Sequence, residues 1–336
     1  MTLAPRANPD LRGHAAAEAT LAAAMGSGRL HHAWLITGPE GIGKATLAFR
    51  FARRLLAGGA AGTDLALLPE HPIFRRVAAG SHADLLTVER EWDPKRKRVR
   101  GEIVVDDVRR AVDFLRRTPA EGGWRVVVLD GAEDLNRNAA NAMLKMLEEP
   151  PARAMLLLVC SAAGRLLPTI RSRCRRLRLA PLGEADVAEI LGAAMPELAP
   201  AERQRLAGLA EGSAGRALQL AEAGAGEYGT LVDEVLHGRR PLDMTRAHAV
   251  ADALGRHEDG FAIFMELLRA AIAAAVRGAA RGRADAAQTR LIGDRPLAAW
   301  VDVWHALTRL QTETEAAYLD KRQAVVTGLG LLTGTD

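Results

Sequence analysis

A glycine-rich loop between an apolar segment and an amphipathic segment constrains this sequence more than any other feature. Residues 38–44, Gly-Pro-Glu-Gly-Ile-Gly-Lys, follow the apolar run 33–37, and Leu47, Phe51 and Leu55 then recur every four residues. A strand, a G-x-x-x-x-G-K loop and a helix in this order form a P-loop, which aims backbone N–H groups and the positive helix end at phosphate. We therefore predict a P-loop fold around these residues.

Short apolar runs recur through the first half of the chain. They lie at 33–37, 84–89, 125–130 and 155–161, and a further run at 175–180 alternates charged with apolar residues. Near-continuous apolar strands with helical segments between them are typical of a parallel sheet covered by helices on both faces. We therefore predict an α/β parallel-sheet domain over residues 1–180. The spacing of Val108, Val112 and Leu115 predicts a helix, which Asp106 or Asp107 can cap.

Beyond residue 180 the strand pattern disappears and the sequence becomes rich in Ala and Leu. A short helical group predicts a small helical domain over 181–222, and longer helical patterns predict an all-α domain over 223–336. Trp300, Trp304 and Leu307 form a helical stripe that is typical of core or subunit packing. The bias of 271–286 toward Ala, Arg and Gly is that of a mobile loop.

Composition sets limits on partners and location. The net charge of +4 with a pI near 9.4 permits contact with nucleic acid but does not demand it. No apolar run reaches the roughly 18 residues of a membrane span, and the N-terminus lacks a secretion signal pattern. We expect a cytoplasmic protein without membrane contact. The two cysteines, Cys160 and Cys174, have no partners at metal-ligand spacing and are expected to be buried thiols.

The P-loop lacks a group that holds Mg²⁺. The Ser or Thr that should follow the lysine is Ala45, and Thr46 is rotated by about 100° around the helix. Lys44 can still meet a phosphate. The candidate nucleotide-binding residues are Gly38, Gly41, Gly43, Lys44, Thr46 and Asp130. Whether ATP or ADP binds weakly there is left open, no cofactor is required, and no metal site is expected.

The group that activates water is also missing. In P-loop ATPases of the AAA+ type, a Glu follows the Asp at the end of a buried strand, whereas Gly131 follows Asp130 here. Glu133 and Asp134 are not directly beside Asp130 in the sequence. We therefore predict little or no ATP hydrolysis by this chain alone.

A run of arginines follows the last core strand. Arg171, Arg173, Arg175 and Arg176 could form a solvated basic edge. Arg173, however, lies between the helix-like stretch 168–171 and a strand, so its position can be fixed. A fixed guanidinium at a subunit edge can reach a neighbour's ATP site, where such a group is worth about 10³ to 10⁵ in rate.

Four segments in this order resemble the clamp loader of bacterial DNA polymerase III, which belongs to the AAA+ superfamily. They are HHAWLITGPEGIGK (31–44), NAANAMLKMLEEPP (138–151), LPTIRSRC (167–174) and EGSAGRALQL (211–220). The resemblance is strongest to the delta-prime branch of the family. It implies an AAA+ domain, a helical lid and a helical collar in a hetero-oligomeric ring.

The resemblance also implies partners and residue roles. The partners are gamma/tau and delta subunits and, through the complex, the sliding clamp and primer-template DNA of replication. Arg173 becomes an arginine finger supplied in trans to a gamma/tau site, with Ser172 and Cys174 positioning it. The chain itself would then be a scaffold and a part of the DNA polymerase holoenzyme, with little ATPase of its own.

Two departures from the family pattern refine this expectation. Active subunits carry an arginine in the lid where this chain has Gly215, which favours delta-prime over gamma. Many members carry a four-cysteine zinc module after the P-loop helix, but residues 57–89 contain no cysteine, and His71 and His82 cannot replace four thiolates. We therefore predict no zinc.

Alternative functions stay under consideration at this stage. A self-sufficient AAA+ ATPase, either a gamma/tau-type clamp-loader subunit or another remodelling factor, is opposed by Ala45, Gly131 and Gly215. A P-loop kinase lacks a visible acceptor site. The basic segment 93–102 fits either a DNA contact or a solvated hairpin.

Overall fold

The computed structural model describes residues 4–27, 30–59, 65–94, 97–237, 242–255 and 260–333. The chain divides into two compact units. The first consists of Met1–Leu198 with Ala210–Arg216, and the second of Ala199–Leu209 with Ala217–Asp336. The division into three domains at 180 and 222 stays a prediction.

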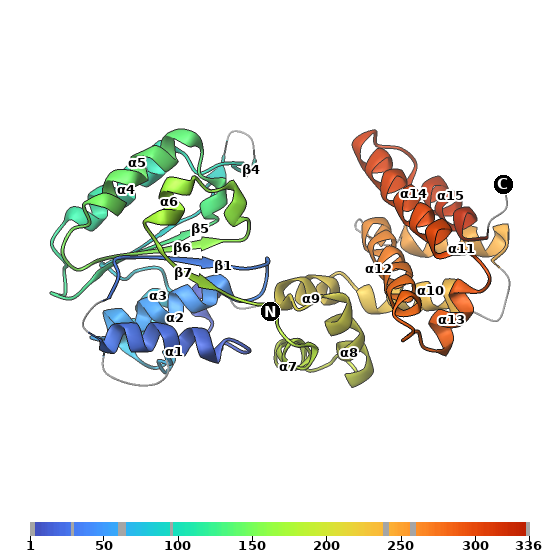
Figure 1. The fold of residues 1–336 in the computed structure, drawn as a ribbon, viewed down its shortest axis with the longest axis horizontal. Helices are drawn as coiled ribbons and strands as arrows, with labels where there is room; N and C mark the ends of the chain where they lie inside the picture. The colour runs from blue at the N-terminus through green and yellow to red at the C-terminus, as the bar shows by residue number, and fades with distance from the viewer. Residues whose placement is uncertain are drawn as a thin grey trace. The chain divides into compact units, whose positions relative to one another are not determined.

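The first unit is built on a five-stranded parallel sheet in the order β2-β5-β6-β1-β7 (Figure 1). Its strands are β1 (Ala33–Thr37), β2 (Leu85–Val88), β5 (Arg125–Asp130), β6 (Ala154–Cys160) and β7 (Arg175–Arg178). Each strand falls within one residue or two of a predicted apolar run. The predicted α/β parallel-sheet fold is confirmed.

Helices cover both faces of this sheet (Figure 1). One face carries α1 (Ala15–Gly26), α2 (Lys44–Leu56) and α3 (Pro72–Ala78), and the other carries α4 (Val105–Arg116), α5 (Arg137–Glu148) and α6 (Pro168–Ser172). Alternate strand residues supply the two cores: Trp34 faces the α2 side, and Leu35 faces the α5 side. Burial on both faces explains why the strands read as near-continuous apolar runs.

The ends of α4 and α5 show how well local signals predict helix boundaries. Neither Asp106 nor Asp107 occupies the N-cap position of α4, which is Val104. Asp107 lies in the first turn of the helix, and its Oδ2 accepts the Val104 N–H at 3.0 Å. α5 begins after Asn136, whose side chain accepts from the Ala139 N–H at 2.9 Å. α5 ends at Glu148, shortly before Pro150, because proline cannot continue a helix.

Buried arginines of α2 fasten the N-terminal segment, which includes the short helix η1 (Pro5–Ala7), onto the sheet unit. Arg50 pairs with Glu18 at 2.7 Å. Arg53 donates to the Asn8 carbonyl at 2.8 Å and lies 4.3 Å above the Phe74 ring, and burial lowers its pKa to about 10. Backbone carbonyls of the segment accept Nη hydrogens from both arginines, as buried donors require, whereas Arg53 Nε is buried without a hydrogen-bond partner.

Smaller elements complete the first unit. They are the antiparallel pair β3 (Trp92–Asp93) and β4 (Arg98–Val99), the 3-10 turns η2 (Ala132–Asp134) and η3 (Ala163–Arg165), and α7 (Glu184–Ala194). The basic segment 93–102 therefore contains a hairpin, although Lys95 and Arg96 lie outside the described residues. Its role in binding DNA stays a prediction.

All the described elements of the second unit are helices. They are α8 (Pro200–Leu209), the end of α9 (Ala214–Glu222), α10 (Ala225–His237), α11 (Met244–Leu254), α12 (Gly260–Ala280), α13 (Ala286–Ile292), α14 (Leu297–Ala316) and α15 (Lys321–Thr333). Trp300 and Leu307 of the predicted stripe are buried, while Trp304 is half-buried.

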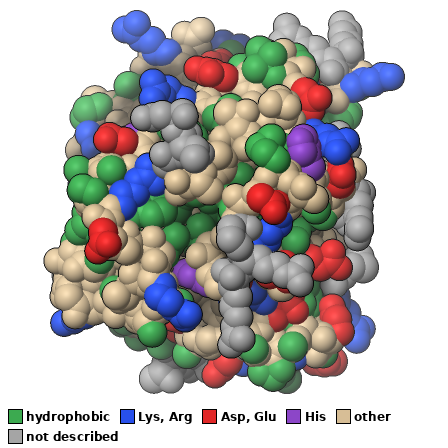
Figure 2. Space-filling model, turned by 90° about the vertical axis from the view of Figure 1, so that its right-hand side faces the viewer, with side chains coloured by type: hydrophobic (Ala, Val, Ile, Leu, Met, Phe, Trp, Pro, Cys, Tyr) green, Lys and Arg blue, Asp and Glu red, His purple; other side chains and the backbone are tan. Residues whose placement is uncertain are grey.

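One expectation for the second unit is wrong. Most of the segment 271–286 is not a loop, because α12 continues to Ala280, and only residues 281–285 connect it to α13. Its alanines favour a helix, and Ile272 and Ala275 are fully buried along it. Within the described ranges, no helix has the length and apolar character that crossing a membrane requires. On the face seen in Figure 2, apolar, acidic and basic side chains are interspersed rather than gathered by kind.

Candidate functional site

The phosphate loop has the backbone that its glycines predict. It leaves β1 at Thr37 and enters α2 at Lys44. Gly41 and Gly43 have φ angles of +73° and +101°, which glycine adopts without steric cost. His14 Nε2 donates to the Ile42 carbonyl at 2.7 Å and holds the turn from the N-terminal side. The loop is therefore a rigid part of the fold.

The lysine of the loop is engaged with the protein itself. Lys44 Nζ donates to the Pro39 carbonyl at 2.5 Å, and the residue is buried. Burial lowers the pKa of Lys44, against the opposing effect of Glu133 and Asp130 nearby. Ala45 presents no oxygen next to this amine. The lysine is thus placed to meet a phosphate but is turned back onto its own loop.

Asp130 ends β5 beside this lysine. Burial raises the pKa of Asp130, and the neighbouring Glu89 adds to the increase. Gly131 follows with a left-handed φ of +80°, and the η2 turn then brings Glu133 back toward the loop. Glu133 Oε1 accepts the Ser161 N–H at 2.8 Å, whereas its Oε2 is buried without a hydrogen-bond partner.

Sequence reasoning missed the position of Glu133. The acid is two residues farther along the chain than a water-activating Glu, yet it is close enough to raise the pKa of both Asp130 and Lys44. The signal that could have found it is Gly131, because a glycine directly after a buried strand permits the left-handed residue that reverses the chain.

A segment far along the chain closes over the loop. The Gly215 N–H donates to the Gly41 carbonyl at 2.8 Å. A Cβ on Gly41 would lie 2.3 Å from Ser213 Oγ, and a Cβ on Gly215 would lie 2.9 Å from Gly41 Cα. The 2.9 Å contact with backbone is too short for a Cβ at position 215, and Gly41 in addition has a left-handed φ of +73°, so glycine is favoured at both positions. Residues 38–46, 130–134 and 213–215 together form what we call the phosphate-loop corner.

Arg173 lies in a second place, directly after α6. Its Nη1 donates to the Thr169 carbonyl at 3.0 Å, and its Nη2 lies 2.8 Å from Glu148 Oε1 at the end of α5. The Arg173 side chain is 35% exposed. The guanidinium is therefore held in place and still reaches solvent. Residues 148 and 167–174 form the arginine corner.

The two neighbours of Arg173 differ in environment. Ser172 is exposed and donates its hydroxyl to the Thr169 carbonyl at 3.1 Å, the same acceptor that Arg173 uses. Cys174 is buried in the core between the sheet and α5, and burial raises its pKa to about 12. Cys174 thus anchors the backbone next to Arg173, and neither neighbour touches the guanidinium through a hydrogen bond given by the structure.

The structure separates Arg173 from the predicted nucleotide-binding residues. β7 runs parallel to β1, with Trp34 opposite Arg175 and Thr37 opposite Arg178. Arg173 precedes β7, whereas the phosphate loop follows β1, so the two lie at opposite edges of the sheet. The length of a strand, on the order of 10 Å, stands between them. Arg173 cannot serve the phosphate loop of its own chain.

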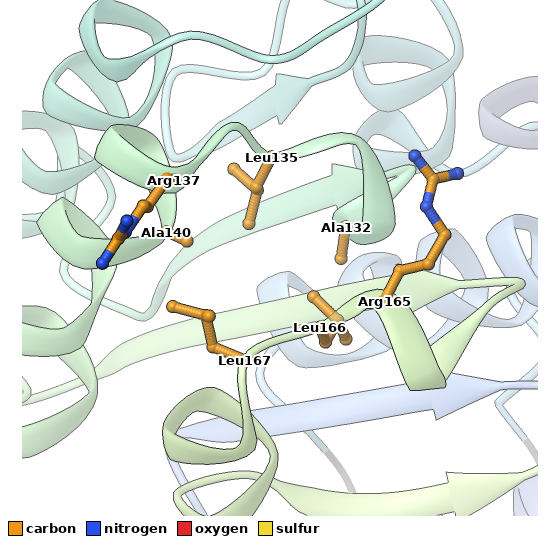
Figure 3. A pocket seen from close by; sticks show the side chains of 7 residues that line it. All are labelled: Ala132, Leu135, Arg137, Ala140, Arg165, Leu166 and Leu167. Carbon is orange, nitrogen blue, oxygen red and sulfur yellow. The ribbon is translucent and has the colours of Figure 1, made fainter.

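A surface pocket of about 270 Å³ lies on the α5 side of the unit. It is lined by Ala132, Leu135, Arg137, Ala140, Arg165, Leu166 and Leu167. Figure 3 shows the apolar side chains in the middle and the two arginines at opposite ends. None of its lining residues belongs to the glycine loop, so the pocket is not a nucleotide site built on that loop.

The two histidines considered against zinc have structural contacts. His71 Nδ1 accepts the Ile73 N–H at 3.2 Å at the start of α3. His82 is buried and its Nδ1 accepts the Asp84 N–H at 3.1 Å. In the part of the chain that the structure describes, no three His, Cys, Asp or Glu side chains are grouped to hold a metal ion.

Comparison with known proteins identifies relatives of the first unit. A family model described as DNA polymerase III, delta subunit, matches residues 13–183, just over half of the chain. The delta' subunit of DNA polymerase III from Pseudomonas aeruginosa is 41% identical over 187 residues, which cover 54% of this chain and 53% of that protein.

Two further relatives extend the comparison. The delta' subunit from Escherichia coli is 37% identical over 170 residues, covering 48% of this chain and 46% of that protein. The tau subunit from Salmonella typhimurium is 29% identical over 262 residues, covering 75% of this chain and 39% of that protein. The chain thus spans about half, or less, of the length of the curated relatives it matches.

Proposed function

This chain belongs to the family of the DNA polymerase III delta subunit, and we propose that it is a delta-prime-like subunit of the clamp loader. In this proposal it assembles with gamma or tau and delta subunits and supplies Arg173 in trans to a neighbouring gamma/tau ATP site. The assembly loads the sliding clamp on primed DNA during replication. The higher identity to delta' subunits than to tau supports this branch of the family.

One observation carries the proposal: the Arg173 guanidinium is held, partly exposed and out of reach of its own phosphate loop. Its anchors are Thr169 and Glu148, at the opposite edge of the sheet from Gly41 and Lys44. An arginine in this position can stabilise the charge of a transferring phosphoryl group only on another molecule. A neighbouring subunit that presents ATP to this edge meets that requirement.

The phosphate-loop corner supports the same division of labour. Ala45 and Gly131 remove the oxygen that holds Mg²⁺ and the carboxylate that activates water. Lys44 Nζ donates to the Pro39 carbonyl, so the amine that would meet a phosphate is engaged with its own loop. We propose that the subunit requires no nucleotide, magnesium or zinc, and that it works in the bacterial cytoplasm, where the replicating DNA lies.

The test uses the complex reconstituted with gamma/tau and delta subunits and the sliding clamp. Arg173→Ala is expected to slow ATP hydrolysis at the one site that it serves by about 10³-fold. Single-turnover hydrolysis separates that site from the others, and clamp loading on primed DNA is measured in parallel. Assembly, followed by size-exclusion chromatography, should be unchanged.

The matched control is Arg176→Ala, which removes a nearby exposed arginine of β7. Equal hydrolysis rates in the Arg173→Ala complex and the unmodified complex would refute the role of Arg173 as an arginine finger. The purified chain alone should show no ATP turnover above background. Turnover comparable to that of an active clamp loader would support the alternative of a self-sufficient ATPase.

A further inference from the structure

Glu148 contacts the guanidinium of Arg173 from a different helix. We propose that Glu148 is a positioning residue, which orients the Arg173 guanidinium before a neighbouring ATP site arrives. The inference rests on the proposed function of Arg173 as a finger, and its first test is independent of that function. The contact is Arg173 Nη2 to Glu148 Oε1, at 2.8 Å.

Two anchors on different elements fix the plane of the guanidinium. Nη1 donates to the Thr169 carbonyl in α6 at 3.0 Å, and Nη2 is held by Glu148 at the end of α5. With only one of these contacts, the arginine side chain could still rotate about its own single bonds and turn the guanidinium. Because a guanidinium carries five N–H donors, these two contacts leave three for an incoming phosphate.

Buried neighbours hold the backbone of Glu148 in place. It is the last residue of α5, directly after Met146 and Leu147, which are both buried in the core, and the chain reaches Pro150 two residues later. An acidic side chain in the last turn opposes the helix dipole, which favours a cation there. Helix stability therefore does not explain an acid at this place, whereas its contact with Arg173 does.

The contact is exposed enough to be exchanged. The side chains of Arg173 and Glu148 are 35% and 50% exposed, and solvent weakens ion pairs of this kind. A phosphoryl group in a dry neighbouring site would attract the guanidinium more strongly than this carboxylate does. Glu148 can thus set the direction of Arg173 without keeping it from its target.

Glu149 provides a matched control. It is the adjacent residue, equally acidic and exposed, and the structure gives it no contact with Arg173. Any effect of lost negative charge at the end of α5 should be the same for both glutamates. An effect specific to Glu148 therefore reports on the contact itself.

The first test measures order in the isolated chain, without any partner. In protein labelled with ¹⁵N-arginine, the order parameter of the Arg173 Nε–H is expected to be high and to fall in Glu148→Ala, but not in Glu149→Ala. The thermal midpoint should be the same in both variants. An order parameter unaffected by Glu148→Ala would overturn the inference, whatever the function of Arg173.

The second test measures the neighbour's site in the reconstituted complex. Glu148→Ala should lower the single-turnover rate about tenfold by misplacing the guanidinium, with the KM for ATP unchanged. Glu148→Gln, which keeps an acceptor oxygen, should recover part of the rate, and Glu149→Ala should leave it unchanged. In the Arg173→Ala background, Glu148→Ala should have no further effect.

The outcomes of the second test separate the two claims. If Arg173→Ala lowers the rate but Glu148→Ala does not, the positioning role is wrong and the finger stands. If Arg173→Ala has no effect on the rate, the finger is wrong, and the order parameter alone decides whether Glu148 holds the guanidinium. Equal losses in Glu148→Ala with and without Arg173 would also refute the positioning role.

Discussion

The phosphate-loop corner and the arginine corner lie at opposite edges of one parallel sheet, and they differ in where their polar groups point. In the first, Lys44 donates to the Pro39 carbonyl and the Gly41 carbonyl accepts the Gly215 N–H, so the lysine that would meet a nucleotide is turned toward its own loop. In the second, Arg173 has anchors on one side and solvent on the other. We infer that the loop serves the fold of this chain, whereas the arginine serves another molecule.

The difference shows why a motif match alone does not establish a function. Gly41 and Gly43 preserve the backbone of a phosphate loop, because that backbone joins β1 to α2 whether or not a ligand is present. Chemistry needs side-chain oxygens in addition, and Ala45 and Gly131 do not supply them. Backbone shape and catalytic groups can therefore be lost separately.

The largest effect is expected from Gly41→Ala in the phosphate-loop corner. The added Cβ would lie 2.3 Å from Ser213 Oγ, and the φ of +73° is unfavourable for alanine. The backbone term costs about 1–2 kcal/mol and overpacking about 1–3 kcal/mol. We expect the free energy of unfolding, from denaturant titration, to fall by about 2–5 kcal/mol.

Gly164→Ala is the control for this substitution, because a Cβ there meets no atom within 4 Å. A loss below about 0.5 kcal/mol for Gly41→Ala, the range of ordinary surface substitutions, would contradict the close contact with residues 213–215. The loop would then be open to ligands, and the contrast between the two corners would weaken.

A pH-dependent effect is expected from the two buried thiols. Cys174 belongs to the arginine corner, and Cys160 lies beside the phosphate-loop corner. Burial raises the pKa of Cys160, which ends β6 close to Glu133, and of Cys174, each to about 12. The folded state thus keeps both thiols protonated at a pH where the unfolded chain ionises them. The free energy of unfolding should be unaffected by these groups below about pH 9 and should fall as the pH rises toward 12.

Thiol labelling shows whether one corner opens before the other. With iodoacetamide at neutral pH, neither cysteine should react in the native chain, and both should react in guanidinium chloride. Cys160→Ala and Cys174→Ala assign the modified sites by mass spectrometry. Rapid labelling of Cys174 alone would mean that the arginine corner opens locally, and the guanidinium would then not be held as described.

The smallest effect is expected from Arg173→Ala on the stability of the isolated chain. Its ion pair with Glu148 is exposed on both sides, and such pairs contribute about 0–1 kcal/mol. The free energy of unfolding should therefore change by less than about 1 kcal/mol, while hydrolysis in the complex changes greatly. A loss above about 2 kcal/mol would make Arg173 a structural residue and remove the contrast.

Local signals predicted the sheet well because its strands are buried on both faces. The apolar runs at 33–37 and 125–130 match β1 and β5 residue for residue, and Pro150 marks the end of α5. The same kind of reasoning was wrong for 271–280, where composition suggested a loop, because burial of Ile272 in a helix depends on packing partners distant in sequence. The prediction also placed the N-cap of α4 at the wrong residue. Asp107 lies inside the helix, and its side chain accepts the N–H of the N-cap residue Val104.

The sequence by itself determined the glycine loop, the missing groups at Ala45 and Gly131, and the arginine between a helix and a strand. These are properties of residue type and spacing along the chain. Only the tertiary structure decided that Gly215 lies on Gly41, that Glu133 turns back toward Lys44, and that Glu148 holds Arg173. Each of these contacts joins residues that are separated in the chain. Whether such residues come together depends on the order of the strands in the sheet and on the edge of the sheet from which each loop extends.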